Sequence, residues 1–183
     1  MNISCNFKTS LIVVALLSFS TAQAATLTKA EYKADKTRIS ADYKAAKNAC
    51  DAMKDNAKDV CVQEAKAKES VARAELEYSY TGKAADQTKV HEAKAKSTYA
   101  VAKEKCDDLE GNAKDVCVKE AKAVETKALA DAKMGKEIGE AKKEASEDKS
   151  DANYKVATEK CDALSGDSKT SCMAAAKTKF GKY

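Results

Sequence analysis

The chain has 183 residues, of which 44% are hydrophobic and 34% charged, with no proline, no tryptophan and only six glycines. Ala, Lys and Glu are strong helix formers, so this composition excludes most β architectures. The 33 Lys and Arg are interspersed with 29 Asp and Glu, which argues against a nucleic-acid surface. The interspersed charges predict exposed helices with local ion pairs, among them Glu64–Lys68, Glu92–Lys96, Asp115–Lys119 and Asp151–Lys155.

Residues 1–24 have the three parts of a secretory signal peptide. Lys8 supplies the positive charge, residues 11–19 form the apolar region, and residues 22–24 (Ala-Gln-Ala) form the cleavage site. The apolar run is about half of the roughly 20 residues that a membrane span requires. We therefore expect Cys5 to be lost on cleavage, the mature chain to contain no membrane span, and the protein to be periplasmic or secreted.

The rest of the chain contains three copies of one sequence repeat. The period is about 55 residues, which is typical of an array of supersecondary units. The similar segments are residues 43–70, 99–126 and 154–181. Each segment contains two cysteines eleven positions apart, namely Cys50/Cys61, Cys106/Cys117 and Cys161/Cys172. Six cysteines in regular pairs in an exported chain indicate a disulfide framework.

The residues between paired cysteines predict a turn. In one straight helix the two Cα atoms would lie about 16 Å apart, whereas a disulfide requires less than about 7 Å. Gly111 suits the left-handed end of a helix, and Asn112 can cap the next one. Gly166 and Asp167 repeat this pattern, while the first segment has Asp55 in place of the glycine. We therefore expect the disulfides Cys50–Cys61, Cys106–Cys117 and Cys161–Cys172, each stapling a helical hairpin beside its turn.

Apolar residues before and after each turn have helical spacing. The stripes before the turns are Tyr43, Ala46, Cys50 and Met53; Tyr99, Ala102, Cys106 and Leu109; and Tyr154, Ala157, Cys161 and Leu164. The answering stripes after the first two turns are Cys61, Ala65, Ala72 and Leu76, and Cys117, Ala121, Val124 and Ala128. At the start of the first helix, Thr28 and Glu31 form a capping box.

The predicted fold is all-α: an array of three disulfide-stapled helical hairpins with coiled-coil-like stripes, about six helices in total and no β-sheet. The hairpins are expected at residues 25–80, 86–134 and 140–183. Gly82 separates the first two, and Gly135 with Gly139 forms a hinge before the third.

The sequence lacks the patterns of a catalytic or metal site. Zinc, haem and redox-active motifs use Cys-x-x-Cys spacing, which does not occur, and the single histidine, His91, lies outside the cysteine segments. Nucleophilic catalysis needs a base and an orienting group beside the nucleophile, and one histidine supplies no such set. We expect no catalytic residues, no bound metal and no cofactor.

The segment at residues 102–123, AKEKCDDLEGNAKDVCVKEAKA, resembles a group of uncharacterised, exported, Ala/Lys-rich proteobacterial proteins with Cys-x10-Cys repeats. These proteins are sometimes labelled TolA-like or cell envelope biogenesis proteins. The resemblance implies no catalytic residues.

The expected function is that of a non-enzymatic periplasmic helical repeat protein with a structural or stress-associated role in the cell envelope. Its partners are unknown and could be other envelope components. Two alternatives remain open: a hydrophilin-like protectant against drying or osmotic stress, and a thiol-based sink for metals or oxidants, which requires reduced cysteines.

Overall fold

The computed structural model describes residues 27–182, so the expected signal peptide and Cys5 lie outside the described residues. The described part contains five α-helices, two short 3-10 helices and no strand, which confirms the all-α prediction with three stapled hairpins. The helices are α1 (Lys29–Ala49), α2 (Asp55–Thr81), α3 (Ala84–Lys105), α4 (Gly111–Asp162) and α5 (Gly166–Phe180), with η1 (Cys50–Ala52) and η2 (Cys106–Asp108) at the first two hairpin turns.

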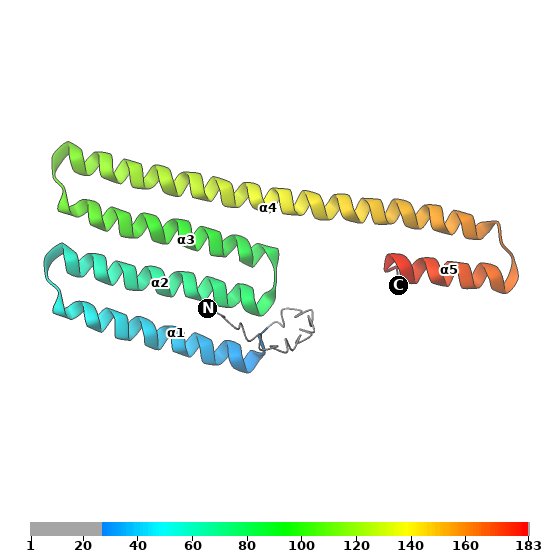
Figure 1. Ribbon diagram of the computed structural model, residues 1–183, viewed down its shortest axis with the longest axis horizontal. Helices are drawn as coiled ribbons and strands as arrows, with labels where there is room; N and C mark the ends of the chain where they lie inside the picture. Colours follow the sequence, from blue (N-terminus) through cyan, green and yellow to red (C-terminus); the bar gives the residue numbers. More distant parts are fainter. Residues whose placement is uncertain (1–26, 183) are drawn as a thin grey trace, which may run out of the picture.

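The helices form a single layer. Helices α1, α2, α3 and the first part of α4 lie side by side, while α5 folds back along the end of α4 (Figure 1). Among the described helices, extensive contact occurs only between neighbours in the sequence. Eleven of the described residues are buried, and three of these are Cys50, Cys106 and Cys161. The layer is therefore held by narrow contact stripes instead of one central core.

None of the helices within residues 27–182 combines the length and the apolar character that crossing a lipid bilayer requires.

The start of α1 follows the sequence prediction. Thr28 Oγ1 accepts a hydrogen bond from the Glu31 backbone N–H, and the Glu31 carboxylate accepts one from the Thr28 N–H at 2.8 Å. This reciprocal pair satisfies two backbone donors that the first helical turn leaves free. One turn further, Tyr32 stacks on Tyr80 at 4.6 Å between ring centroids and donates its hydroxyl to Glu77 at 2.8 Å. These contacts fix the open end of the first hairpin.

The turn between α2 and α3 depends on Gly82, as predicted. Gly82 has φ +63°, a left-handed conformation that glycine adopts without steric cost, and its N–H closes the helix on the Tyr78 carbonyl at 2.8 Å. Asp86, which is buried, accepts hydrogen bonds from Thr81 Oγ1 at 2.6 Å and from Lys89 Nζ at 2.8 Å. The bond from Lys89, followed by that from Thr81, lowers the pKa of Asp86 below its ordinary value.

Cross-helix ion pairs set the register between α2 and α3. Glu64 pairs with Lys105 at 2.9 Å and Glu75 pairs with Lys94 at 2.7 Å, one near each end of the interface. Between them, Ser97 Oγ donates to the Ala67 carbonyl at 3.5 Å. Through these contacts hairpins 1 and 2 form one continuous layer.

Of the four local ion pairs expected from the sequence, the described residues form one, Glu92–Lys96 at 3.8 Å. Glu64 bonds across to Lys105, and Asp151 bonds across to Lys182. A cross-helix partner competes with the i,i+4 partner for the same carboxylate, and sequence spacing alone does not indicate which partner is within reach.

The chain does not bend where a hinge was expected, at Gly135 and Gly139. Helix α4 is continuous over 52 residues, so hairpins 2 and 3 share it and the described helices number five instead of about six. A glycine in a helix interior costs only about 1 kcal/mol relative to alanine. Strong helix formers surround both glycines, with ion pairs Lys133–Glu137 and Lys136–Glu140 at 3.8 Å each. The helix therefore continues through them.

The apolar stripes are partly as predicted. Ala65 and Leu76 are buried, but Val124 is 59% exposed, and the buried position is that of its neighbour Glu125. The Glu125 carboxylate accepts a hydrogen bond from Lys122 Nζ at 2.6 Å, and the Lys122 ammonium lies 4.9 Å from the centre of the Tyr99 ring. A paired carboxylate thus occupies the face of α4 that contacts α3, and the valine lies outside it.

The two types of glycine environment give a testable contrast. Gly111 has φ +52°, whereas Gly135 lies in regular helix, and an added Cβ would meet nothing within 4 Å at either position. We expect Gly111→Ala to destabilise the second turn by about 1 kcal/mol because of its left-handed backbone. Gly135→Ala should stabilise α4 by about 1 kcal/mol. Hydrogen exchange, read separately for residues 106–117 and 130–145, measures both effects; shifts in the same direction would contradict the assignment.

Candidate functional site

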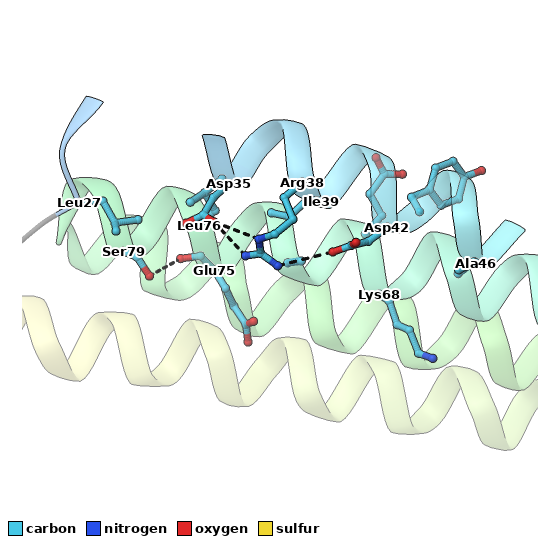
Figure 2. A pocket seen from close by; sticks show the side chains of 14 residues that line it. Leu27, Asp35, Arg38, Ile39, Asp42, Ala46, Lys68, Glu75, Leu76 and Ser79 are labelled. Atoms are coloured by element: carbon cyan, nitrogen blue, oxygen red, sulfur yellow. Dashed lines mark hydrogen bonds and ion pairs between the residues drawn. The ribbon is translucent and has the colours of Figure 1, made fainter. Parts of the chain in front are cut away.

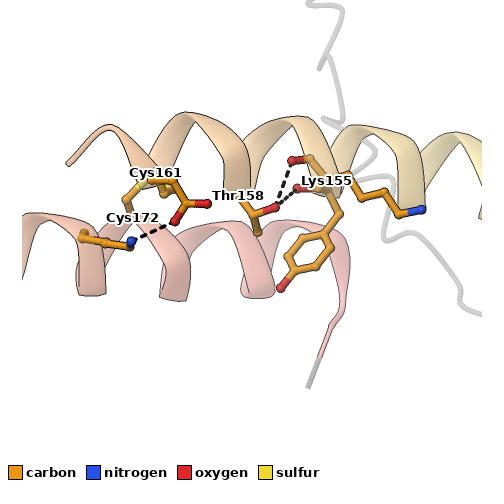
Figure 3. Close-up of a disulfide and its surroundings, with 7 residues drawn as sticks. Lys155, Thr158, Cys161 and Cys172 are labelled. Carbon is orange, nitrogen blue, oxygen red and sulfur yellow. Dashed lines mark hydrogen bonds and ion pairs between the residues drawn. A yellow bond between two sulfur atoms is a disulfide. The ribbon is translucent and has the colours of Figure 1, made fainter. Parts of the chain in front are cut away.

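The three turn units, residues 50–61, 106–117 and 161–172, are the chemically distinctive part of the molecule. The disulfides predicted from the sequence are all present, each between the two cysteines of one repeat. Their Cα atoms lie 5.7, 5.7 and 5.6 Å apart, within the range that a disulfide permits. Figure 3 shows the third unit, where Cys161 of α4 is bonded to Cys172 of α5.

The backbone follows the same path in all three turn units. A short turn ends where the N–H of Met53, Leu109 or Leu164 donates to the carbonyl of the first cysteine at 3.0 Å. These three apolar residues are 46%, 41% and 43% exposed, so they are not part of a buried stripe, contrary to the prediction. Two residues later the chain has positive φ, at Asp55 (52°), Gly111 (52°) and Gly166 (56°). Asp55 thus adopts the conformation that glycine adopts in the other two repeats.

The expected capping role of Asn112 is not observed. The residue preceding α4 is Glu110, and no side chain caps this helix. The equivalent residue in the first repeat, Asn56, instead donates its side-chain amide to the Glu104 carbonyl at 3.1 Å. Asn56 therefore ties the first turn to the end of α3, which is a contact between hairpins.

An ion pair bridges every turn beside its disulfide, and the sequence analysis did not identify it. The pairs are Asp51–Lys58, Asp107–Lys114 and Asp162–Lys169, each at 2.9 Å. In each repeat an Asp follows the first cysteine, and a Lys stands three positions before the second. The recurrence of this Asp and this Lys in all three repeats is the sequence pattern from which the ion pairs could have been predicted. A covalent and an ionic contact together connect the two helices at each turn.

The ion pairs shift the pKa values of their partners. The hydrogen bond from Lys58 lowers the pKa of Asp51, and the same bond raises the pKa of Lys58. Asp107 raises the pKa of Lys114 in the second turn in the same way. Opposite charges at hydrogen-bonding distance favour both charged forms.

The two cysteines of each disulfide differ in their solvent exposure. The first cysteine of each pair is almost fully buried, at 0%, 0% and 1% exposure, while the second is partly exposed. Thiol–disulfide exchange proceeds by attack of a thiolate on one sulfur, so burial of one partner limits the directions of attack. This arrangement fits a structural bond.

Two open grooves run along one face of the layer, on either side of a ridge of α2 formed by Lys68, Ala72 and Glu75. The groove between α1 and α2 has a volume of about 600 Å³ and contains the buried Ile39 in its floor. Arg38 lies over this groove and bonds to Asp35 and Asp42 at 3.0 and 3.5 Å (Figure 2). A single guanidinium thus bridges two carboxylates of α1 along the rim of this groove.

His91 lies on an exposed part of α3, beside Gly135 and Gly139 of α4, and no cysteine lines the same hollow. Within residues 27–182 no group of three or more His, Cys, Asp or Glu side chains is arranged to hold a metal ion.

No protein-family model matches the chain, and neither a curated protein nor a solved structure matches it. Its function is therefore inferred from the geometry of the described residues.

The Asp51–Lys58 pair predicts a pH dependence. Because the pKa of Asp51 is lowered in the folded state, the contribution of the pair is present above the unfolded value of about 3.9 and is lost as the pH falls through the folded value. We expect Lys58→Met to return the pKa of Asp51 to its ordinary range, as measured by NMR titration. Lys54→Met, which removes a lysine of the same turn without touching the pair, is the control. An unchanged Asp51 titration in Lys58→Met would refute the pairing.

The disulfide of the third unit is expected to decide whether α5 folds. Helix α5 has 15 residues and, within residues 27–182, packs only on α4, and isolated helices of this length are marginal in water. Replacing Cys161 and Cys172 by Ser should cost about 3 kcal/mol and abolish the hydrogen-exchange protection of α5. Helices α1 to α3 should keep their protection. An even loss of protection across residues 27–182 would show instead that the layer unfolds as one unit.

Proposed function

We propose that this chain is a non-enzymatic helical repeat protein of the periplasm or the secreted space, with a structural or stress-associated role in the cell envelope. The observation that carries the proposal is the single layer of three disulfide-stapled hairpins, extended by the 52-residue helix α4. Arrays of this kind contact partners through long open faces, because each unit packs only on its neighbours.

The disulfides support the proposed location in the periplasm or the secreted space. Bonds of this kind persist in oxidising environments and are rare where thiols are kept reduced. The resemblance of residues 102–123 to exported Ala/Lys-rich proteobacterial proteins supports the same assignment. The exposed apolar residues at the turns, Met53, Leu109 and Leu164, are accessible points of contact for other envelope components.

The proposal is tested in cells in two steps. Alkylation of intact cells should leave Cys50, Cys61, Cys106, Cys117, Cys161 and Cys172 unmodified until a reductant is added. A photoreactive residue in place of Leu109 should then crosslink to envelope components, while one at Lys133, on a charged face of α4, should not. Free thiols in the exported protein would support the thiol-sink alternative, and the absence of any envelope crosslink at Leu109 would count against the structural role.

A hydrophilin-like protectant is the second candidate, and the thin packing of the layer favours it. Only eleven described residues are buried, and the long segment 133–149 of α4 is exposed throughout. A protectant is expected to be weakly ordered in dilute solution and to fold on drying.

Circular dichroism separates the two candidates. The structural proposal predicts a helix-dominated far-UV spectrum for the oxidised protein in dilute buffer, little changed by drying. A coil spectrum that becomes helical only on drying or in alcohol would transfer support to the protectant. Reduction of the disulfides provides the matched comparison, because it should lower helicity in the first case and leave a coil spectrum unchanged in the second.

A further inference from the structure

The outer stripe of α4 is a row of exposed residues on the face that points away from α3 and α5. Val124, Met134 and Val156 of this stripe are 59%, 54% and 54% exposed. At 100° per residue the members fall on one side of α4, with Val124 at the edge of the stripe: Val116, Ala123, Val124, Met134, Ile138, Ala141, Ala145, Ala152 and Val156. Glu125 and Cys161, buried toward α3 and α5, lie on the other side.

The first half of the outer stripe corresponds in sequence to the face of α2 that contacts α3. Counted from the second cysteine of each repeat, Glu120 occupies the position of Glu64, and Asp131 that of Glu75. Glu64 and Glu75 are the carboxylates that bond to α3. The carboxylates of Glu120 and Asp131 keep the same charge, but within the described residues no cation lies within ion-pair distance of either.

The second half of the outer stripe corresponds in sequence to the face of α3 that contacts α2. Counted from the first cysteine, Lys149 occupies the position of Lys94, and Lys160 that of Lys105. Lys94 and Lys105 are the partners of the α2 carboxylates. Val156 likewise occupies the position of Val101, which lines the groove between α2 and α3. Helix α4 thus carries both halves of an interface that the first two hairpins have already formed.

The two halves cannot meet within the straight helix. Asp131 and Lys149 are about 27 Å apart along its axis, given 18 residues at 1.5 Å each. The complementary positions are nevertheless arranged symmetrically: Asp131 and Lys149 are equidistant from Glu140, as are Glu120 and Lys160. The valines Val124 and Val156 are equidistant from the same residue.

We propose that two copies of this chain pair through antiparallel α4 helices, with a twofold axis at Glu140. Asp131 of each copy then meets Lys149 of the other, Glu120 meets Lys160, and Val124 covers Val156. In such an isologous interface, residues on one edge of the outer stripe contact residues on the same edge in the other copy. All four charged positions lie along one edge of the stripe, so they can meet in this way. The apolar residues supply the burial, while the exposed ion pairs set the register.

The pairing completes the array that the sequence predicts. The second half of α4 from one copy, followed by its α5, continues the layer α1–α2–α3–α4 of the other copy. Each half of the dimer then contains three hairpins in sequence order, with the third supplied by the partner. This is the relation of a domain swap, in which a contact available within one chain is made between two.

Charge reversal tests the pairing with the purified, oxidised protein. The wild-type protein should have twice the monomer mass by light scattering and sedimentation. Asp131→Lys or Lys149→Glu alone creates two like-charge contacts in the dimer and should raise its dissociation constant about tenfold, corresponding to about 1.4 kcal/mol. Mixing the two single variants restores every opposite-charge contact, so the mixture should regain the wild-type dissociation constant. The double variant Asp131→Lys/Lys149→Glu should regain it as well.

Lys133→Glu is the matched control, since it makes the same change in charge as Lys149→Glu but lies off the outer stripe. It should leave the dissociation constant unchanged. Val124→Asp, which places a charge against Val156 of the other copy, should abolish the dimer. A wild-type protein that stays monomeric at its highest soluble concentration would overturn the proposal. Rescue in the double variant without rescue in the mixture would overturn it too, because it would place the contact within one chain.

Discussion

A disulfide between cysteines eleven residues apart requires the chain to reverse between them, and the remainder of this fold follows from that constraint. The reversal places two helices antiparallel, buries the first cysteine of each pair, and brings Asp51 within 2.9 Å of Lys58 and their equivalents together in the other turns. A bridge beside a turn acts on only two helices. Three such bridges therefore define three local units, and the contacts between units have to come from other residues.

Those contacts are made mainly by small apolar residues and by charged side chains, which explains why the helices form a layer. Ala65 and Ala95 are buried in α2 and α3, but each covers little apolar surface, so a second layer of helices would gain little by packing on the first. Ion pairs such as Glu75–Lys94 are exposed and each contributes little to stability, yet they select one register. A weakly packed layer with a fixed register leaves long faces open, which is compatible with the proposed structural role.

Local chemistry decided how much of this could be predicted from the sequence. The disulfides, the left-handed Gly111 and Gly82, and the Thr28 cap each depend on residues close in the chain, and these predictions are confirmed. Gly82 ends α2 because Thr81 and Asp86 stabilise the turn around it, whereas Gly135 has no such neighbours and the helix continues. The sequence did not predict that Glu125, and not Val124, is buried at the contact with α3. That burial depends on where Lys122 and Tyr99 lie in space.

The pairing of consecutive cysteines also bears on how the protein is made. Six cysteines can pair in 15 ways, and the set observed here joins the first to the second, the third to the fourth and the fifth to the sixth. A chain that reaches an oxidant starting from its N-terminus presents each native partner before any competing cysteine of the next repeat arrives. Simple order of arrival thus yields the native bonds, and each hairpin is locked before the next one is complete. Maturation then needs an oxidant but little reshuffling of wrong bonds.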